Sequence, residues 1–238
     1  MDRRNKISII IPTLNEEASL EGLLVQLAQF ATEVPHELIV VDGKSTDRTE
    51  EIAQRYCDQV LITDPGRGRQ LNRGASVASG EILWFLHADS RVDRECIPKL
   101  LQKVSEGARG GCFSMQFMDP SPVYRVIAWG SNFRAKWLKS FYGDQGIFVE
   151  REVFLGLGGF REIPIMEDLD FSRRLKKAVP VSRVEATLDT SPRRFQKGVF
   201  RTLLLMQVLK LAFLLKVNPH VLARVYGAGK GSSNLYST

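Results

Sequence analysis

The fold of this chain is predicted mainly from the stretch Glu81-Ile82-Leu83-Trp84-Phe85-Leu86-His87-Ala88-Asp89-Ser90. Five consecutive apolar residues between Gly80 and a polar cluster predict a fully buried strand over residues 81–86. The strand runs directly into His87 and Asp89, and ligands of open α/β sheets bind just outside the carboxyl ends of strands. The stretch alone leaves two alternatives open: a ligand site, or a satisfied histidine followed by a helix-capping aspartate.

Upstream of this stretch, short apolar runs alternate with segments of helical periodicity. Strands are predicted over residues 6–11, 37–42 and 60–62. Helices are predicted around Leu20, Leu23, Leu24 and Leu27, around Ile52, Ala53 and Tyr56, and within or after a basic, glycine-rich turn at 66–75. This alternation is typical of an α/β fold with a Rossmann-like, mainly parallel sheet flanked by helices. The Asn15 turn, Asp42 and the loop 87–89 should then converge on one edge of the sheet.

Downstream of Asp89 the alternation is weaker. Helices are predicted over 97–104, 123–138 and 167–177, strands over 110–118 and 147–149, and a flexible apolar loop over 156–160. A strongly apolar helix is predicted over 199–217, and the Gly/Ser-rich tail 227–238 is predicted to be loose. The uninterrupted apolar runs of the 199–217 helix are too short to span a bilayer. An in-plane membrane helix, a core-packing helix and a homodimer contact remain open for it.

Composition limits the cellular compartments and the binding partners that we expect for this chain. The chain has 238 residues, a net charge of +6 and three widely spaced cysteines, Cys57, Cys96 and Cys112. Such spacing suggests neither a zinc site nor a disulfide framework, and a reducing cytoplasm is the natural compartment. The first apolar run is too short for a signal peptide. Basic residues over 193–201 precede an apolar run, which favours an anionic membrane surface or phosphate groups over nucleic acid as the partner.

Several polar residues are candidates for chemistry, each with a structural alternative. Asp42 could accept hydrogen bonds from a nucleobase or from ribose hydroxyls, or it could cap a helix. Asp89 suits Mg²⁺ or Mn²⁺, which take one or two carboxylates plus substrate phosphates, and His87 suits Mn²⁺ better than Mg²⁺. The pair Glu167 and Asp168 is either a stabilising acid pair at a helix start or includes a general base. A weak anion-site signal comes from the arginines of the glycine-rich turn, Arg67, Arg69 and Arg73.

Six segments between residues 7 and 177 combine strand ends, polar turns and acidic residues. They are Ile9-Ile10-Ile11-Pro12-Thr13-Leu14-Asn15-Glu16, Val40-Val41-Asp42-Gly43-Lys44-Ser45-Thr46-Asp47-Arg48-Thr49, Gly68-Arg69-Gln70-Leu71-Asn72-Arg73-Gly74-Ala75, Leu86-His87-Ala88-Asp89-Ser90, Gly143-Asp144-Gln145-Gly146 and Met166-Glu167-Asp168-Leu169-Asp170. In this order and spacing the segments resemble the family 2 glycosyltransferases of GT-A fold. The resemblance is greatest to a bacterial subgroup with a Leu-His-Ala-Asp motif.

The resemblance implies a role for each matched residue. The catalytic base would be Asp168, and Asp89 would bind the metal with His87, which replaces the first acid of the usual Asp-x-Asp motif. The nucleotide would be bound by Pro12, Asn15, Glu16, Asp42, Lys44, Arg69 and Ala88. The acceptor or donor sugar would lie near Asp144, Gln145 and Glu167.

The resemblance also implies a domain plan with a C-terminal helical extension. Residues 1–190 would form the GT-A catalytic domain, with a nucleotide-binding half at 1–92 and an acceptor-binding half at 93–190. Residues 191–238 would form an amphipathic or apolar helix and a loose tail. This extension suggests two kinds of interaction. One is peripheral contact with the cytoplasmic face of a membrane through 193–217, and the other is a homodimer.

The activity that the resemblance implies is inverting transfer of a single sugar. The donor would be a nucleotide-diphosphate sugar, expected to be a UDP-sugar, with Mn²⁺ or Mg²⁺ as cofactor. The acceptor would be a hydroxyl or carboxylate, with a lipid as one candidate, and no nucleic acid is expected. The chain lacks the Gln-x-x-Arg-Trp motif of processive synthases. Two alternatives remain: a nucleotide-sugar-binding protein without transferase activity, and a nucleotidyltransferase.

Overall fold

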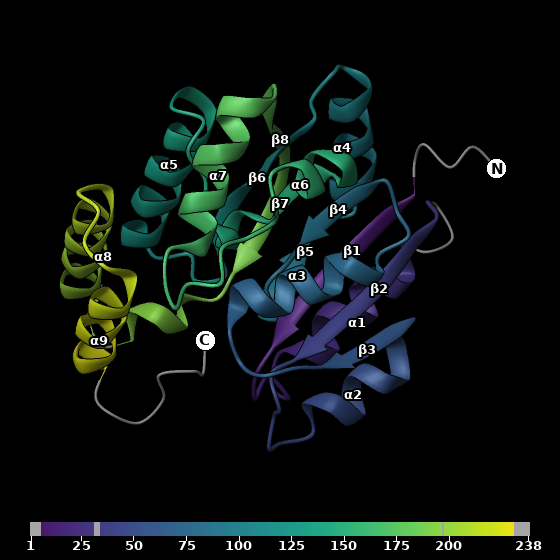
Figure 1. The fold of residues 1–238 in the computed structure, drawn as a ribbon, viewed down its shortest axis with the longest axis horizontal. Coiled ribbons are helices and arrows are strands. Elements are labelled where there is room, and N and C mark those ends of the chain that lie inside the picture. The colour runs from purple at the N-terminus through teal and green to yellow at the C-terminus, as the bar shows by residue number, and fades with distance from the viewer. Residues whose placement is uncertain (1–5, 31–33, 197, 231–238) are drawn as a thin grey trace.

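The computed structural model describes residues 6–30, 34–196 and 198–230, with side chains up to residue 227. Within these residues, eight strands form one mixed sheet in the order β3-β2-β1-β4-β7-β6-β8-β5. Helices cover both faces of the sheet (Figure 1). The strands are β1 Ile7–Thr13, β2 His36–Asp42, β3 Gln59–Ile62, β4 Ile82–Phe85, β5 Ser90–Val92, β6 Gly110–Phe117, β7 Ile147–Glu150 and β8 Val181–Thr190. The helices are α1 Leu20–Gln29, α2 Thr49–Tyr56, α3 Arg67–Val77, α4 Cys96–Ser105, α5 Pro122–Trp137, α6 Arg151–Gly156, α7 Glu167–Ala178, α8 Val199–Leu214 and α9 Pro219–Lys230, with 3₁₀ turns η2 Gly143–Gln145 and η3 Pro192–Phe195.

The first four strands form the predicted parallel unit. β1 pairs in parallel with both β2 and β4, and β3 pairs in parallel with β2. Their β-branched and aliphatic residues suit a pleated surface that is covered on both faces. The predicted α/β fold with a mainly parallel sheet is therefore confirmed, and the carboxyl ends of β1, β2 and β4 lie at one edge.

The second half adds antiparallel pairs to this unit. β7 is antiparallel to both β4 and β6, and β5 is antiparallel to β8. Four elements were not predicted from the sequence: β5, α6, β8 and α9. In β8, the charged residues Arg183, Glu185 and Asp189 interrupt the apolar pattern, so the strand could not be recognised. Val184 and Leu188 nevertheless point into the core. The loop predicted at 156–160 is partly helical, because α6 ends at Gly156.

The strand β4 lies between two apolar cores, one on each face of the sheet. On one face the Trp84 ring stacks on Phe113, with 4.7 Å between the ring centroids. On the other, Phe85 packs against Phe154 and Phe160 at 5.2 and 5.0 Å. Such burial on both faces accounts for the uninterrupted apolar run of the sequence. The predicted buried strand is confirmed.

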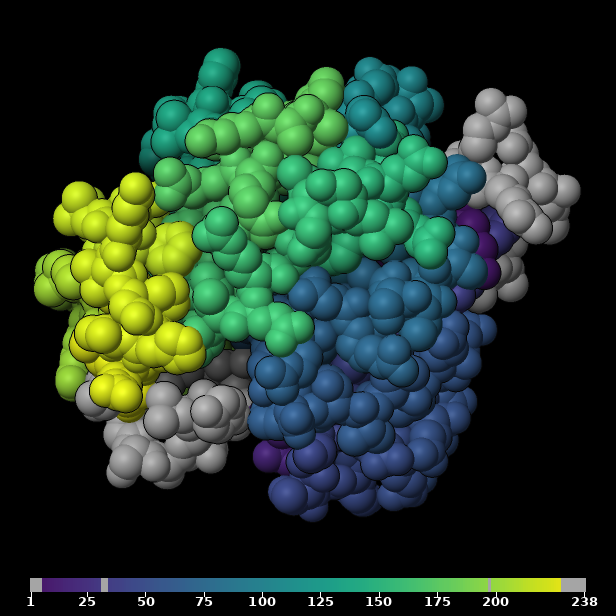
Figure 2. Space-filling view, in the orientation of Figure 1, coloured from purple at the N-terminus to yellow at the C-terminus, as the bar shows by residue number. Residues whose placement is uncertain are grey.

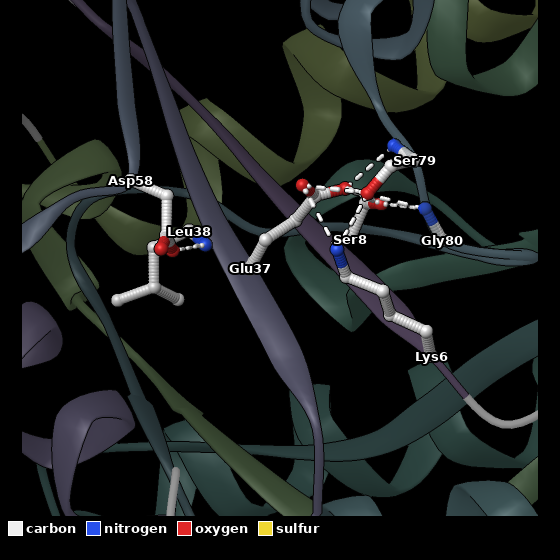
Figure 3. Close-up of polar contacts among 7 residues, drawn as sticks. All are labelled: Lys6, Ser8, Glu37, Leu38, Asp58, Ser79 and Gly80. Atoms are coloured by element: carbon white, nitrogen blue, oxygen red, sulfur yellow. Dashed lines mark hydrogen bonds and ion pairs between the residues drawn. The ribbon is translucent and has the colours of Figure 1, made fainter. Parts of the chain in front are cut away.

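A buried carboxylate joins three segments at the amino ends of these strands (Figure 3). Glu37 of β2 accepts hydrogen bonds from Ser8 Oγ at 2.5 Å, Ser79 N at 2.6 Å and Gly80 N at 3.2 Å. Lys6 Nζ lies 3.5 Å from its second oxygen. Glu37 thereby ties β1 and β2 to the turn before β4, at the end of the sheet opposite the predicted site.

The C-terminal extension is a pair of helices that pack on the catalytic part. Leu209 of α8 and Leu222 of α9 are buried against Met166 and Leu169. The predicted helix is confirmed as α8, but the tail predicted to be loose from Gly227 continues α9 as far as Lys230; its remainder, 231–238, lies outside the described residues. Over the described ranges, the structure contains no helix with the length and apolarity needed to cross a membrane.

Candidate active site

Loops from both halves of the chain surround one small pocket at the carboxyl edge of the sheet. Its walls are formed by Arg67, Leu71, Phe85, Leu86, His87, Gly143, Ile147, Phe160 and Asp168. His87 enters from the end of β4, Gly143 from η2, and Asp168 from the start of α7. The structure thus brings together two polar residues that were predicted separately, His87 and Asp168.

The turns after β1 and β2 are held to each other by Asn15 and Asp42. Asn15 adopts a left-handed conformation with φ of 54°, and its Oδ1 accepts a hydrogen bond from Thr46 N at 2.8 Å. Asp42 is buried and accepts from Thr13 Oγ1 at 2.9 Å and from Ser45 N at 2.7 Å. These contacts give both residues a structural role at the predicted edge.

Lys44 and Arg69 lie on the exposed rim of this region. Lys44 Nζ is 2.6 Å from Asp64, and Arg69 contacts Asp64 at 3.4 Å and Glu162 at 3.1 Å. Arg67, rather than Arg69, lines the pocket. Residues two apart on a helix point to different sides, so α3 cannot direct both arginines to the same place.

Of the other nucleotide-site residues predicted from the resemblance, Pro12 is half-buried in β1, and Ala88 is buried within the apolar core. Glu16 is buried and pairs with a residue from the far end of the chain. Arg193 of η3 donates to both Glu16 carboxylate oxygens, at 3.1 and 3.0 Å, and its Nη2 also lies 3.0 Å from Asp89 Oδ2. A single guanidinium therefore bridges two carboxylates that were predicted to act separately. Arg193 was not predicted as a site residue.

Asp168 is oriented by two backbone amides. Its Oδ2 accepts from Gly143 N at 2.8 Å and its Oδ1 from Leu169 N at 2.6 Å. A Cβ on residue 143 would lie 2.6 Å from His87 Nε2, so glycine is needed for this close approach. Burial, followed by the charges of Arg67, Arg194 and Arg193, holds the pKa of His87 well below its usual value. The imidazole is therefore neutral at physiological pH.

Two further carboxylates near the pocket have raised pKa values. Burial raises the pKa of Asp144, which forms an ion pair with Arg194 at 3.8 Å. Burial also raises the pKa of Glu167, which pairs with Arg67 at 3.5 Å. Desolvated carboxylates beside arginines are common at functional sites.

Gln145, predicted near the sugar, is fully buried. Its Nε2 donates to the carbonyl of Phe113 at 3.4 Å, and its Oε1 accepts from Arg134 at 3.3 Å. The side chain is thus used inside the protein, and it fixes the turn that carries Gly143 and Asp144.

The residues present fit a divalent cation in one way. Nowhere in the described part of the chain do three His, Cys, Asp or Glu residues group as a complete metal site. Mg²⁺ and Mn²⁺ are often held by one or two carboxylates plus substrate phosphates, so Asp89 alone suffices on the protein side. Asp89 already has a cationic partner in Arg193. Neutral His87 is chemically competent as a ligand, but it faces Gly143 and the pocket.

Comparisons with known proteins bear on the family and the fold of the chain. A family model described as Glycosyl transferase family 2 matches residues 8–160. A PGL/p-HBAD biosynthesis glycosyltransferase from Mycobacterium bovis BCG is 33% identical over 186 residues, covering 70% of this chain and 68% of the relative. A dolichol-phosphate mannosyltransferase from Pyrococcus furiosus is 33% identical over 109 residues, covering 43% of this chain but only 31% of its own length.

A solved structure supports the GT-A fold across most of the chain. Glucosyl-3-phosphoglycerate synthase from Mycobacterium tuberculosis, in complex with Mn²⁺, UDP and glucosyl-3-phosphoglycerate, superposes with a TM-score of 0.60. The superposition covers 89% of this chain and 79% of the synthase at 22% sequence identity. Identity at this level supports the fold alone.

Proposed function

The chain belongs to the family 2 glycosyltransferases, and on this basis we propose that it transfers a single sugar, with inversion, from a nucleotide-diphosphate sugar to an acceptor hydroxyl or carboxylate. The observation that carries the proposal is the pocket that joins Asp168, His87 and Arg67, with Asp89 and two further arginines beside it. This set supplies a candidate base on one side and cations for a leaving diphosphate on the other. In this proposal Asp168 and Asp89 keep the roles that the resemblance implies.

Asp168 acts as the general base in this proposal. Its two hydrogen bonds from backbone amides fix the carboxylate, which retains further lone pairs for an acceptor hydroxyl. The acceptor oxygen attacks the anomeric carbon as its proton passes to Asp168, and the bond from that carbon to the diphosphate oxygen breaks. A positioned general base contributes about 10²- to 10⁴-fold to the rate. Neutral His87 beside Asp168 adds no positive charge that would weaken the base.

The charge of the departing diphosphate is balanced by residues of this chain. Arg67 begins α3, whereas Arg193 and Arg194 are neighbours in η3, and arginine binds phosphate oxygens in a bidentate manner. Arg67 and Arg193 replace Arg69 in this role, because Arg69 is held at the rim by Asp64 and Glu162. Asp89 would hold Mn²⁺ or Mg²⁺, and such an ion supplies Lewis-acid stabilisation of the leaving oxygens.

The substrates are proposed from the relatives. A UDP-sugar is the proposed donor, since the synthase of the same fold was crystallised with UDP and Mn²⁺. A lipid is the proposed acceptor class, in keeping with a relative named for dolichol phosphate. Asn15, Asp42 and Glu16 would lie beside the nucleotide, and Asp144, Gln145 and Glu167 beside the sugars.

The test is a donor screen with the full-length protein. UDP-glucose, UDP-N-acetylglucosamine, UDP-galactose and GDP-mannose are each supplied with Mn²⁺ or Mg²⁺ and a panel of hydroxyl, carboxylate and lipid-phosphate acceptors. Mass spectrometry should detect one glycosylated product and release of the nucleoside diphosphate. Tight binding of a donor by calorimetry, with neither hydrolysis nor transfer, would replace the proposal by a nucleotide-sugar-binding protein. Release of pyrophosphate from a nucleoside triphosphate and a sugar phosphate would indicate a nucleotidyltransferase.

A further inference from the structure

Helix α5 carries a stripe of large apolar, mostly aromatic side chains that are exposed and do not pack in the protein core. Val126, Trp129, Phe133 and Trp137 are between 48% and 69% exposed, and their spacing of three and four residues places them on one face. The Trp129 and Phe133 rings stack with centroids 5.7 Å apart. Four large apolar side chains on one face of a packed helix indicate a surface that meets another apolar phase.

The opposite face of α5 anchors the helix firmly. Ala128 and Ala135 are buried. Asn132 accepts a hydrogen bond from Met115 N and donates one to Met115 O on β6, both at 2.9 Å. The aromatic stripe is therefore presented outwards by a helix whose packing is already complete.

Helix α8 carries a second apolar stripe. Its members are 54% to 82% exposed and repeat at helical spacing: Phe200, Leu204, Val208, Leu211 and, just after the helix, Leu215. The opposite side holds Leu209, which is buried against Leu222 of α9. As on α5, one face packs and the other remains apolar and exposed.

The two helices lie beside each other on one flank of the molecule (Figure 1). The Tyr142 ring is contacted by Arg134 of α5, 4.1 Å from its centroid, and by Lys210 of α8, at 5.4 Å. Figure 2 shows α8 and α9, in yellow, projecting from the edge of the molecule next to the teal segment that includes α5. A common partner can therefore reach both helices.

The charges around these stripes are all of one sign. The sequence has no Asp or Glu between residues 120 and 143, or anywhere after Asp189. The same segments contain twelve Lys and Arg residues, while the whole chain has an excess of only +6, so the rest of the protein is net acidic. Tryptophan beside basic residues is typical of the membrane–water interface, and anionic lipid attracts segments rich in Lys and Arg.

We propose that α5 and α8 together form a membrane-binding face that lies on the surface of an anionic lipid bilayer. The aromatic and aliphatic stripes enter the headgroup region, and Arg125, Lys136, Arg201 and Lys216 contact the lipid phosphates. Residues 193–217 were the part of the chain predicted to contact the membrane, and this proposal extends the contact to α5. This binding does not depend on the transferase proposal.

The proposed membrane-binding face lies close to the candidate base Asp168. Tyr142, which contacts both helices, directly precedes Gly143, whose amide donates to Asp168. Met166, which packs on Leu209, adopts a left-handed conformation with φ of 69° two residues before Asp168. A lipid-borne acceptor at this face would therefore be close in the fold to the candidate base.

The experiment is vesicle flotation of the full-length protein. Vesicles of phosphatidylcholine alone are compared with vesicles containing about 30% phosphatidylglycerol, at low and high salt. We expect binding to the anionic vesicles only, reduced by salt because exposed charges are screened. Trp84 is buried and Trp129 and Trp137 are exposed, so a blue shift of tryptophan emission on binding reports on α5.

Two variants test the two helices separately. Trp129→Ser with Phe133→Ser, and Phe200→Ser with Leu204→Ser, should each weaken binding at least about tenfold, because each pair removes two large apolar side chains from the contact with lipid. The matched control is Val25→Ser with Leu155→Ser, two exposed apolar residues on α1 and α6, which should bind like wild type. Circular dichroism verifies that each variant is folded.

Two results would overturn the proposal. One is equal binding of wild type and both stripe variants to anionic vesicles, or no binding by wild type. The other is a wild-type dimer in light scattering that the stripe variants convert to monomer without any change in vesicle binding. The second result would assign the face to another copy of this chain. Neither result bears on the donor screen, so the transferase proposal is tested independently.

Discussion

Glu37, at the amino end of the parallel strands, and two carboxylates beside the pocket, Asp144 and Glu167, have pKa shifts of opposite sign. At the amino end, burial acts to raise the pKa of Glu37, but hydrogen bonds from Ser8 and Ser79 outweigh it and the pKa is lowered. At the carboxyl end, burial raises the pKa of Asp144 and Glu167, and their ion pairs with arginine, at 3.8 and 3.5 Å, are long. A saturated carboxylate stabilises the fold, whereas an undersatisfied one is available for substrate.

This contrast predicts that substitutions at one end affect the chemistry and those at the other end affect stability. The Glu37 cluster lies far along the strands from the pocket, and it joins segments that hold β1, β2 and β4 in register. We expect the effects to decrease in the order Asp168→Asn, Glu37→Gln, Asp89→Asn and Glu167→Gln. Each is measured by activity, nucleotide binding and unfolding, so that the two kinds of effect are separated.

Asp168→Asn should produce the largest effect. The amide cannot take the acceptor proton, so the transfer rate should fall about 10²- to 10⁴-fold. Nucleotide binding by calorimetry should stay close to wild type. The unfolding midpoint should fall only slightly, because Asn keeps an oxygen for the Gly143 amide and loses only the hydrogen bond from the Leu169 amide. Turnover near the wild-type rate in this variant would remove Asp168 from the role of base.

Glu37→Gln should mainly affect stability. Glutamine can keep its oxygen where Ser8, Ser79 and Gly80 donate, but its NH2 group then replaces the oxygen that faces Lys6 Nζ. The loss of this ion pair, with one donor now facing another, should lower the free energy of unfolding by about 1–3 kcal/mol. Urea unfolding at pH 7 measures this loss. Activity at a temperature where both proteins are folded should be unchanged, and a loss of activity there would break the proposed division between the two ends.

The same variant should flatten the acid limb of the stability curve. Because the folded pKa of Glu37 is lowered, its contribution is present above the ordinary value of 4.5 and is lost as pH falls through the lower folded pKa. The difference between wild type and Glu37→Gln should therefore be greatest near neutral pH and shrink in acid. A difference that is constant with pH would mean that the carboxylate charge is not responsible.

Asp89→Asn tests the bridge made by Arg193 as well as the metal. We expect nucleoside diphosphate affinity in the presence of Mn²⁺ to fall at least about tenfold, equivalent to about 1.4 kcal/mol. In the absence of metal the affinity should be unchanged or higher, because Arg193 is then released from Asp89 for the diphosphate. Arg193→Gln is the matched variant, and it should weaken binding with and without metal. Identical affinities of wild type with and without Mn²⁺ would refute the metal role.

Glu167→Gln should have the smallest effect on stability. The folded pKa of Glu167 is raised, so its favourable contribution is present at low pH and is lost as pH rises through that pKa. A neutral glutamine avoids this loss. The melting temperature of the Glu167→Gln protein should therefore equal or exceed that of wild type at pH 8. Differential scanning calorimetry at pH 5 and pH 8 measures the trend. Destabilisation that grows with pH would place Glu167 with Glu37 as a structural carboxylate.

Local patterns were sufficient for much of the fold. The apolar run of β4 requires burial on both faces, and the acids at the start of α7 favour the helix dipole, so both elements and their boundaries followed from neighbouring residues. β8 was missed because charged residues interrupt its alternation, and pairing with β6 and β5 compensates for them. The helix α9 was missed because its glycines and weak apolar pattern indicate a tail, while Leu222 packs on Leu209.

The sequence by itself determined that Asp42, Asp89 and Asp168 stand at element ends of an α/β sheet, because hydrophobic periodicity sets where strands and helices stop. Only the tertiary structure decided which side chains meet. Arg193 reaches Glu16 across 177 positions, and Arg67 reaches Glu167 across 100. It also turned Arg69 and Lys44 towards Asp64 on the rim, and placed the helices α5 and α8 on one flank. Ion pairs and helix faces depend on packing between distant segments, and no local pattern encodes that packing.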